Sequence, residues 1–181
     1  MLKKYLLLVF LIAIHVAQAQ IYVCKDGLTK FTSEAPLELI KAQSSKMNGV
    51  LDSPNKTVAF SVDVDSFDGF NSALQKEHFR ENYLETEKYS KAFYKGKIIE
   101  DIDFSKNGTY QVRSKGIFNI HGTEKEKIIK VKITVKNNEI EIETSFEIPL
   151  EDHNIKIPRV VNQKIASTIL VEVKANLKVK S

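Results

Sequence analysis

The sequence predicts a mainly β fold, an antiparallel barrel of about eight strands with one or two short helices. Three observations carry this prediction. Many segments alternate between apolar and polar residues, which is the pattern of strands that bury one face. Several of these segments are long, and two contain an internal glycine at which a sheet can bend. Long strands that bend favour closure into a barrel over a sandwich of short strands.

The first half of the chain is expected to supply several strands and one helix. Residues 21–25 are expected to form a short first strand, and residues 28–33 and 45–52 are weaker candidates. The next strand is better defined, because four apolar residues alternate with small or acidic ones: Val58, Phe60, Val62 and Val64. Residues 70–86 contain good helix formers and neither proline nor glycine, which predicts a helix.

The second half adds further strands and a second short helix. Residues 92–99 are rich in β formers, and the apolar residues of 110–120 share one phase around Gly116. Residues 158–166 begin with Pro158 and carry Val161 and Ile165 four positions apart, which predicts a helix. In the last predicted strand one face carries Ile169, Val171, Val173, Ala175, Leu177 and Val179.

The strongest local pattern is a β-hairpin between residues 127 and 150. Two alternating runs flank Asn137 and Asn138, and asparagine tolerates the positive φ that a two-residue turn requires. The register then pairs Lys136 with Glu139, Thr134 with Glu141, Lys132 with Glu143, Val135 with Ile140, Ile133 with Ile142 and Ile129 with Phe146. Charged pairs therefore share one face and apolar pairs the other, and each pair contributes about 0.2–1 kcal/mol.

The first nineteen residues have the anatomy of a secretory signal peptide. Lys3 and Lys4 precede an apolar run, and Ala17-Gln18-Ala19 is an A-x-A cleavage signal. The run is short for a membrane span, which needs about 20 residues. We therefore expect a signal peptide at 1–19, a single domain at 20–181, and a periplasmic or secreted protein with no integral membrane segment after cleavage.

Composition excludes several classes of function. Removal of the two signal lysines lowers the net charge from +4 to +2, and the mixed charges give no case for nucleic-acid binding. The single cysteine, Cys24, lies in an apolar stretch and is expected to be buried, and it excludes an intrachain disulfide. No metal site, catalytic residue or cofactor is expected, because no metal-ligand spacing and no G-x-S-x-G motif is present.

Five segments resemble, in this order, the YceI-like family of polyisoprenoid-binding proteins. They are GLTKFTSEAPLELIKAQSSKMNGVLD (27–52), VAFSVDVDSFDGF (58–70), EHFRENYLETEKYSKAFYKGKI (77–98), GTYQVRSKGIFNIHGTEKEK (108–127) and DHNIKIP (152–158). The resemblance implies an extended eight-stranded, lipocalin-like barrel whose apolar tunnel holds an isoprenoid or quinone-like lipid. It also implies a binding protein rather than an enzyme. The chain departs from the family at Ser90-Lys91, where members often carry a proline, and in lacking tryptophan.

The candidate ligand-binding residues are the apolar side chains expected to point into the barrel. They are Phe60, Val62, Phe79, Phe93, Phe118, Ile133, Ile142, Phe146, Val173 and Leu177. An apolar chain offers only hydrophobic and dispersion contacts, and each buried CH₂ contributes about 0.8 kcal/mol. His78 and His121 are the candidate polar contacts at the mouth of the barrel. The competing interpretation for every one of these residues is an ordinary structural role.

The expected function is export, followed by sequestration or transport of a long-chain apolar lipid. The main alternative is a barrel without ligand that acts as a protein-interaction or stress-response module, which predicts a packed interior. A lipid-modifying enzyme would require at least two titratable side chains that converge in the tunnel, and it ranks last. The sequence leaves open the identity of the lipid and whether the chain forms a homodimer.

Overall fold

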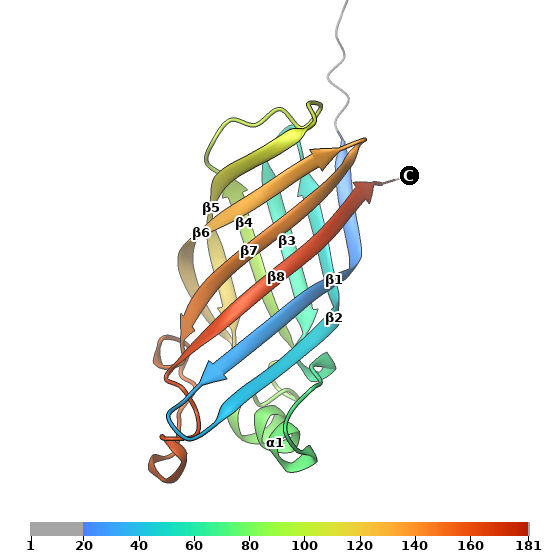
Figure 1. Cartoon of the computed structure of the whole chain (residues 1–181). Coiled ribbons are helices and arrows are strands. Elements are labelled where there is room, and N and C mark those ends of the chain that lie inside the picture. The colour runs from blue at the N-terminus through green and yellow to red at the C-terminus, as the bar shows by residue number, and fades with distance from the viewer. Residues whose placement is uncertain (1–19, 181) are drawn as a thin grey trace, which may run out of the picture.

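The computed structural model describes residues 20–180, which form one closed eight-stranded barrel (Figure 1). Each strand pairs antiparallel with its neighbours, and β8 closes the barrel on β1. The strands are β1 (Ile21–Glu34), β2 (Leu39–Asp52), β3 (Thr57–Asp63), β4 (Lys91–Ile98), β5 (Gly108–Ile120), β6 (Thr123–Lys136), β7 (Glu139–Pro149) and β8 (Thr168–Val179). The expected mainly β, eight-stranded barrel is confirmed. The expected signal peptide at 1–19 lies outside the described residues.

The two ends of the barrel differ in what they carry. One end, which we call the terminal end, holds both ends of the described chain and the turns β2–β3, β4–β5 and β6–β7 (Figure 1). The other end, which we call the mouth end, holds the turns β1–β2 and β5–β6. It also holds the two long connections, from β3 to β4 and from β7 to β8, and these connections contain the helical segments.

The helical segments are shorter than the sequence predicts. The helix expected at 70–86 consists of α1 (Ala73–His78) followed directly by a π-helical turn, η2 (Phe79–Tyr83). Three further segments are single 3-10 turns: η1 (Val64–Ser66), η3 (Glu151–His153) and η4 (Arg159–Val161). The helix predicted at 158–166 is therefore wrong beyond η4. After η4 the chain makes two turn bonds, from Lys164 N and Ile165 N to Val161 O. It also bonds to the β1–β2 region, where Leu37 N donates to Gln163 O and Ala166 N donates to Ser33 Oγ.

The first two strands are longer than predicted because bulges join the short candidate segments. Residues 21–25 and 28–33 belong to the single strand β1, whose register with β2 shifts on both sides of Gly27. A Cβ at Gly27 would lie 2.4 Å from the terminal methyl carbon of Met47, so a larger residue here would require the Met47 side chain to move. Because each bulge switches the face of the following residues, simple alternation fails across it.

The predicted hairpin forms with the predicted turn and register at the terminal end. Asn137 and Asn138 both have positive φ, and the β6–β7 ladder runs from Lys136↔Glu139 to Val131↔Thr144. The expected Ile129–Phe146 pair is wrong, because the β6–β7 ladder stops two residues before it; Phe146 pairs only with Val171 on β8. The ladder ends where the Thr144 hydroxyl donates to the Lys130 carbonyl.

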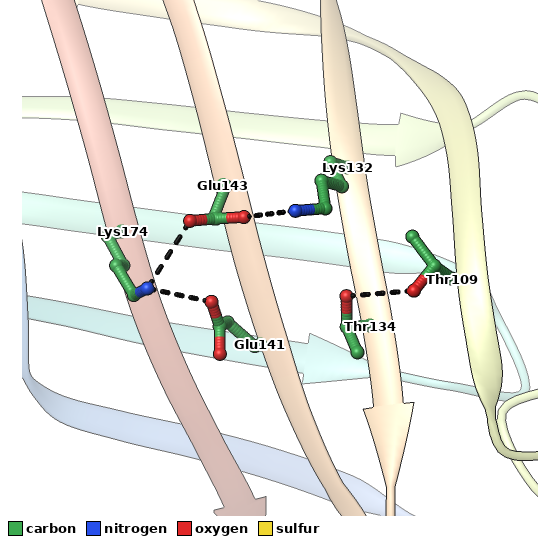
Figure 2. Close-up of polar contacts among 6 residues, drawn as sticks. All are labelled: Thr109, Lys132, Thr134, Glu141, Glu143 and Lys174. Atoms are coloured by element: carbon green, nitrogen blue, oxygen red, sulfur yellow. Dashed lines mark hydrogen bonds and ion pairs between the residues drawn. The ribbon is translucent and has the colours of Figure 1, made fainter.

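The outer face of this hairpin carries the predicted charged side chains (Figure 2). Glu143 lies between Lys132 on β6, at 2.8 Å, and Lys174 on β8, at 3.3 Å. Lys174 also pairs with Glu141 at 2.8 Å, so the glutamates of β7 bond to both neighbouring strands. Hydrogen bonds from the two lysines lower the pKa of Glu143, with Lys132 the larger contribution. The network is exposed, which makes it a solvated outer wall rather than an acid–base pair.

At the mouth end the barrel wall divides into two four-stranded halves. Within the described residues the β2–β3 ladder stops at Asn48↔Ser61 and the β6–β7 ladder stops at Val131↔Thr144. All other neighbouring strands stay paired closer to this end, as β5 and β6 do through Ile120↔Thr123. One half therefore contains β3 to β6, and the other contains β7, β8, β1 and β2.

Each of these two splits is covered by a short segment rather than by strand pairing. The β2–β3 split is covered by the chain after η1, where Gln43 and Asp68 form an isolated bridge with hydrogen bonds of 2.8 and 2.9 Å. The β6–β7 split is covered by η3, where the buried His153 donates from Nδ1 to Thr123 O at 3.1 Å. Side chains complete this second cover, since Lys127 Nζ donates to Glu147 O.

Candidate functional site

The interior of the barrel at the mouth end is a cavity of about 500 Å³. This volume is within the range of about 300–1,000 Å³ that is usual for small-molecule sites. Its lining is mostly aliphatic and aromatic, and it comes from all eight strands and from α1, η2 and the β7–β8 connection. Such a surface binds by excluding water from an apolar ligand.

The inner limit of the cavity can be placed along the strands. On the hairpin, Ile133 and Ile142 line the cavity, whereas the next inward pair, Val135 and Ile140, is fully packed. The same change occurs on β8 between Val173 and Ala175. Beyond this level the terminal end is filled by large side chains with no exposed surface: Tyr22, Leu51, Ile140 and Leu177. The cavity is therefore a blind tunnel that opens at the mouth end.

Four phenylalanines form a cluster beside the opening. Phe31 on β1 stacks on Phe79 of η2, with ring centroids 5.4 Å apart and planes 14° apart. Phe67 and Phe70 complete the cluster, each within 6.1 Å of Phe79. All four rings line the cavity. They attach the helical segment to the barrel through apolar contacts, which offer the same chemistry to a ligand as to the protein.

Hydrogen bonds fix the position of α1 beside the β1–β2 turn. Ser72 caps α1 by accepting from Gln75 N at 3.1 Å. The Gln75 amide donates to Glu38 Oε1 at 2.8 Å, and the Asn71 amide donates to Leu39 O at 3.1 Å. The segment over the mouth is thus held by a few polar bonds and the aromatic cluster, with no buried residue in α1 itself.

A buried pair of hydroxyl groups marks the deep part of the cavity. Tyr94 donates to Ser114 Oγ at 2.9 Å, and burial raises the pKa of the tyrosine although this hydrogen bond opposes the shift. Gly96 leaves space for this pair, because a Cβ at that position would lie 2.6 Å from the Tyr94 hydroxyl. Ser114 is the deepest residue of β5 that lines the cavity, because Val112, nearer the terminal end, does not line it. Thr29 on β1 adds a further hydroxyl, which donates to Met47 Sδ at 3.3 Å, so neutral hydroxyl groups interrupt an otherwise apolar deep wall.

Nine of the ten predicted ligand-binding residues border the cavity. They are Phe60, Val62, Phe79, Phe93, Phe118, Ile133, Ile142, Phe146 and Val173. Leu177 does not, because it faces inward at the terminal end, beyond the floor of the tunnel. Whether any of these residues binds a ligand stays a prediction.

Phe93 borders the cavity, but it lies in the outward-facing phase of β4. Ala92 and Tyr94 occupy the buried inward positions of β4, and the Lys95 ammonium on the outer face lies 5.1 Å from the centroid of the Phe93 ring. Phe93 thus borders the cavity from this outward-facing phase, and its role in ligand binding stays a prediction. The inward aromatic of β4 is Tyr94.

The two predicted polar contacts differ in position. His78, at the end of α1, borders the cavity and is exposed. His121 does not border it and instead connects three loops of the mouth end. Its Nδ1 donates to His153 O at 3.1 Å, its Nε2 contacts Glu85 Oε2 at 2.6 Å, and its ring packs edge-on against Tyr89. His121 therefore has a structural role in this arrangement.

Sequence reasoning missed several lining residues for identifiable reasons. Phe31 lies far from Phe67 and Phe70 in the chain, and only the folded barrel brings it against them. Met47 follows the β2 bulge, so its inward orientation cannot be counted from Ile40. Ser114 lies on the same inward face of β5 as Val112 and Phe118, but a search for apolar residues does not select it because it is polar.

Cys24 is buried, as expected, and lies at the terminal end rather than in the cavity. Burial raises the pKa of its thiol. Among residues 20–180 no cluster of three or more histidine, cysteine or acidic side chains has the geometry of a metal site. In the same range no helix has the length and apolar character of a membrane span.

Comparison with solved structures supports the fold. A polyisoprenoid-binding domain from Saccharophagus degradans, implicated in plant cell wall breakdown, matches with a TM-score of 0.75 and 13% identity over 90% of this chain and 100% of that chain. BcnA of Burkholderia cenocepacia matches with a TM-score of 0.69 and 12% identity, covering 83% of this chain and 95% of that one. The YceI protein of Campylobacter jejuni matches with a TM-score of 0.54 and 16% identity, covering 75% and 83%.

Sequence comparison identifies the family. No curated protein sequence matches the chain. The sequence model of the YceI-like domain matches residues 27–178, which is nearly the whole described barrel and spans all five segments on which the resemblance rests. The chain therefore belongs to the YceI-like family.

Proposed function

We propose that this protein is an exported, non-enzymatic carrier that holds an isoprenoid or quinone-like lipid in its barrel and sequesters or transports it. The observation that carries the proposal is the blind, apolar tunnel of about 500 Å³ at the mouth end. A solved relative in fold is described as a polyisoprenoid-binding domain, which agrees with a ligand of this class. An isoprenoid chain matches a long wall of aliphatic and aromatic side chains and needs no strong polar anchor.

The distribution of titratable groups favours a carrier over an enzyme. Glu38, His78 and Lys164 are all at the outer rim of the cavity. Deeper inside, Tyr94 is paired with a serine hydroxyl and has a raised pKa because it is buried. Tyr83 of η2 also lines the cavity, and burial raises its pKa. General acid–base catalysis works best with groups whose pKa is near the working pH, and burial moves the pKa of both tyrosines away from neutrality.

The hollow interior also supports a carrier over a ligand-free interaction module. A module of that kind needs a packed core throughout, as the terminal end has with Leu51 and Ile140. At the mouth end the inward side chains instead face a cavity. An unfilled apolar cavity is costly, at about 24 cal/mol per Å³ for cavities made by mutation, so a ligand that fills it stabilises the fold.

The first experiment is native mass spectrometry of residues 20–181, purified without detergent, with organic extraction of co-purifying lipid. We expect a one-to-one adduct with an isoprenoid or quinone-like mass. Ala92→Trp places a large ring in the cavity and should abolish the adduct. Ala59→Trp is the matched control, since Ala59 is exposed on the outer face of the neighbouring strand β3. Bare protein that also refuses added quinones and polyprenols would contradict the proposal.

Export is tested separately. Residues 1–19 have the features of a secretory signal peptide, so the mature protein should begin at Gln20. We expect N-terminal sequencing of protein recovered from the periplasm or the medium to start at this residue. Retention of Met1 in protein that stays in the cytoplasm would contradict the export part while leaving the lipid-binding part intact.

A further inference from the structure

Three of the most exposed large apolar side chains of the barrel surround its mouth. Val160 of η4 is 87% exposed, Leu37 of the β1–β2 turn is 66% exposed, and Leu74 of α1 is 58% exposed. They come from three separate connections. Exposed apolar groups that gather around one opening mark a contact surface rather than chance.

Hydrogen bonds hold these three side chains on one rim. Leu37 N donates to Gln163 O at 2.9 Å, which ties the β1–β2 turn to the segment that carries Val160. The Gln75 amide donates to Glu38 Oε1, which ties the residue after Leu74 to the same turn. Leu74 also lines the cavity, so the rim is continuous with the tunnel wall.

The rim carries positive charge on one side. Residues 154–167 contain Lys156, Arg159 and Lys164 and no acidic residue, and all three cations are exposed. None of them forms an ion pair with another described residue. Acidic residues border this segment, since Glu151 and Asp152 directly precede it in η3. Glu34 and Glu38 lie in the facing β1–β2 region, and further glutamates lie in α1 and η2. The positive charge is therefore confined to the η4 side.

We infer that this rim docks on the surface of a lipid bilayer that contains anionic lipids. The inference rests on the proposed lipid-carrier function and adds where the lipid is loaded and released. Exposed apolar side chains next to unpaired lysine and arginine are the combination that binds an anionic interface, with apolar groups at the acyl boundary and cations among the headgroups. Docked in this way, the tunnel opens toward the bilayer, and an apolar chain can enter it without crossing water.

The test measures sedimentation of residues 20–181 with vesicles of phosphatidylcholine, with and without phosphatidylglycerol. The described part of this fragment forms the closed barrel by itself. We expect binding that requires phosphatidylglycerol and weakens as salt is added. Lys156→Gln and Arg159→Gln should each lower the partition coefficient about fivefold. Lys95→Gln and Lys97→Gln, on the outer face of β4, are the charge-matched controls and should have little effect.

The apolar part of the rim is tested with Leu37→Asp and Val160→Asp. Neither residue lines the cavity, so lipid loading should persist. Each change should lower vesicle binding about tenfold. Ile128→Asp is the matched control, because Ile128 is 55% exposed on the outer wall of β6, and this variant should bind vesicles like the unmodified protein.

Loading, measured by native mass spectrometry on the same samples, separates the two proposals. Protein that retains its lipid but ignores anionic vesicles would overturn the docking surface and leave the carrier intact. An equal loss of binding in the Ile128→Asp control would also overturn it, because the contact would then not be specific to the rim. Protein that docks but never takes up lipid would overturn the carrier function on which the inference rests.

Discussion

The terminal end and the mouth end of this barrel are built from the same eight strands, yet one is packed and the other is hollow. At the terminal end the β6–β7 and β2–β3 ladders are intact, and large inward side chains such as Leu51 and Leu177 fill the interior. At the mouth end both ladders are interrupted, and the inward side chains face a cavity. Stability is concentrated where the sheet is continuous, and room for a ligand is found where the sheet divides.

The comparison shows how a closed barrel can hold a cavity and remain folded. An eight-stranded barrel is just wide enough for its side chains to fill the interior, so space must be created deliberately. Here the wall spreads at two splits on opposite sides of the strand order, and the short segments around Asp68 and His153 cover the gaps. At the packed terminal end, continuous strand pairing joins the two halves.

The largest expected effect contrasts one residue type at the two ends of β7. Ile140→Ala, at the packed terminal end, should lower the free energy of unfolding by about 2–5 kcal/mol. Ile148→Ala, on the same face beside the cavity, should cost roughly half of that or less, since fewer contacts are lost there. Urea unfolding of ligand-free protein measures both. Equal losses would mean that the mouth end is packed in solution.

The next effect is a pH dependence of the cover over the β6–β7 split. Burial, followed by the nearby Lys127 and Lys125, lowers the pKa of His153 from 6.5, whereas the Thr123 carbonyl and Asp152 oppose this shift. The unfolded chain therefore takes up the proton first as the pH falls. The stability that the neutral ring provides is complete above the unfolded-state pKa near 6.5 and is lost as the pH falls toward the folded-state value.

Unfolding free energies measured from about pH 8 to about pH 5 test this dependence, and one proton gives a slope of at most about 1.4 kcal/mol per pH unit. His153→Asn is the comparison variant, because asparagine can donate from nearly the same position to the Thr123 carbonyl and does not titrate. We expect a flatter profile for the variant. An identical profile would assign the acid sensitivity to the surface carboxylates instead.

A smaller effect is expected at the boundary between the two ends. Tyr94→Phe removes the hydroxyl that donates to Ser114 and should lower the free energy of unfolding by about 0.5–1.5 kcal/mol. The double variant with Ser114→Ala should be no less stable than the single variant, because no unpaired hydroxyl is left in the wall. Additive losses in a double-mutant cycle would show that the two hydroxyls do not act as a pair.

The smallest effect is expected on the outer wall that both ends share. Glu143→Gln removes the carboxylate that bonds to Lys132 and Lys174, both at exposed positions (Figure 2). We expect a slight decrease of the unfolding midpoint at low salt that disappears at high salt, since exposed ion pairs are screened. The decrease should also vanish under acid, because the lowered pKa of Glu143 adds stability only while the carboxylate is ionised. A loss that persists in high salt would point to packing.

Alternation predicted the face of most strand residues but not their depth in the barrel. Ile142 and Leu177 are both inward, as the sequence indicates, yet only Ile142 reaches the cavity. Depth depends on the register around the whole barrel, and local periodicity contains no information on it. At Phe93 the face itself is difficult to predict. The strand β4 is short, and its sequence does not show whether Phe93 or its neighbour Tyr94 faces inward.

The mouth was harder to predict than the wall because tertiary contacts determine its structure. The sequence from 70 to 86 has helical composition, but Phe70 and Phe79 both pack on Phe31 of β1, and the regular α-helix covers only Ala73–His78. In the segment 158–166, the Gln163 carbonyl and the Ala166 amide bond to the β1–β2 region rather than continuing a helix. Propensity is a weak guide where such contacts compete with it.

The two splits have a consequence for solubility. A fully closed barrel has no free strand edges, whereas each split exposes two, and an uncovered edge can add a strand from another molecule. The segments around Asp68 and His153 cover one edge at each split, with hydrogen bonds to Gln43 of β2 and to Thr123 of β6. Substitutions that dislodge either cover would therefore create a site for edge-to-edge association, and aggregation rather than unfolding would be their first visible defect.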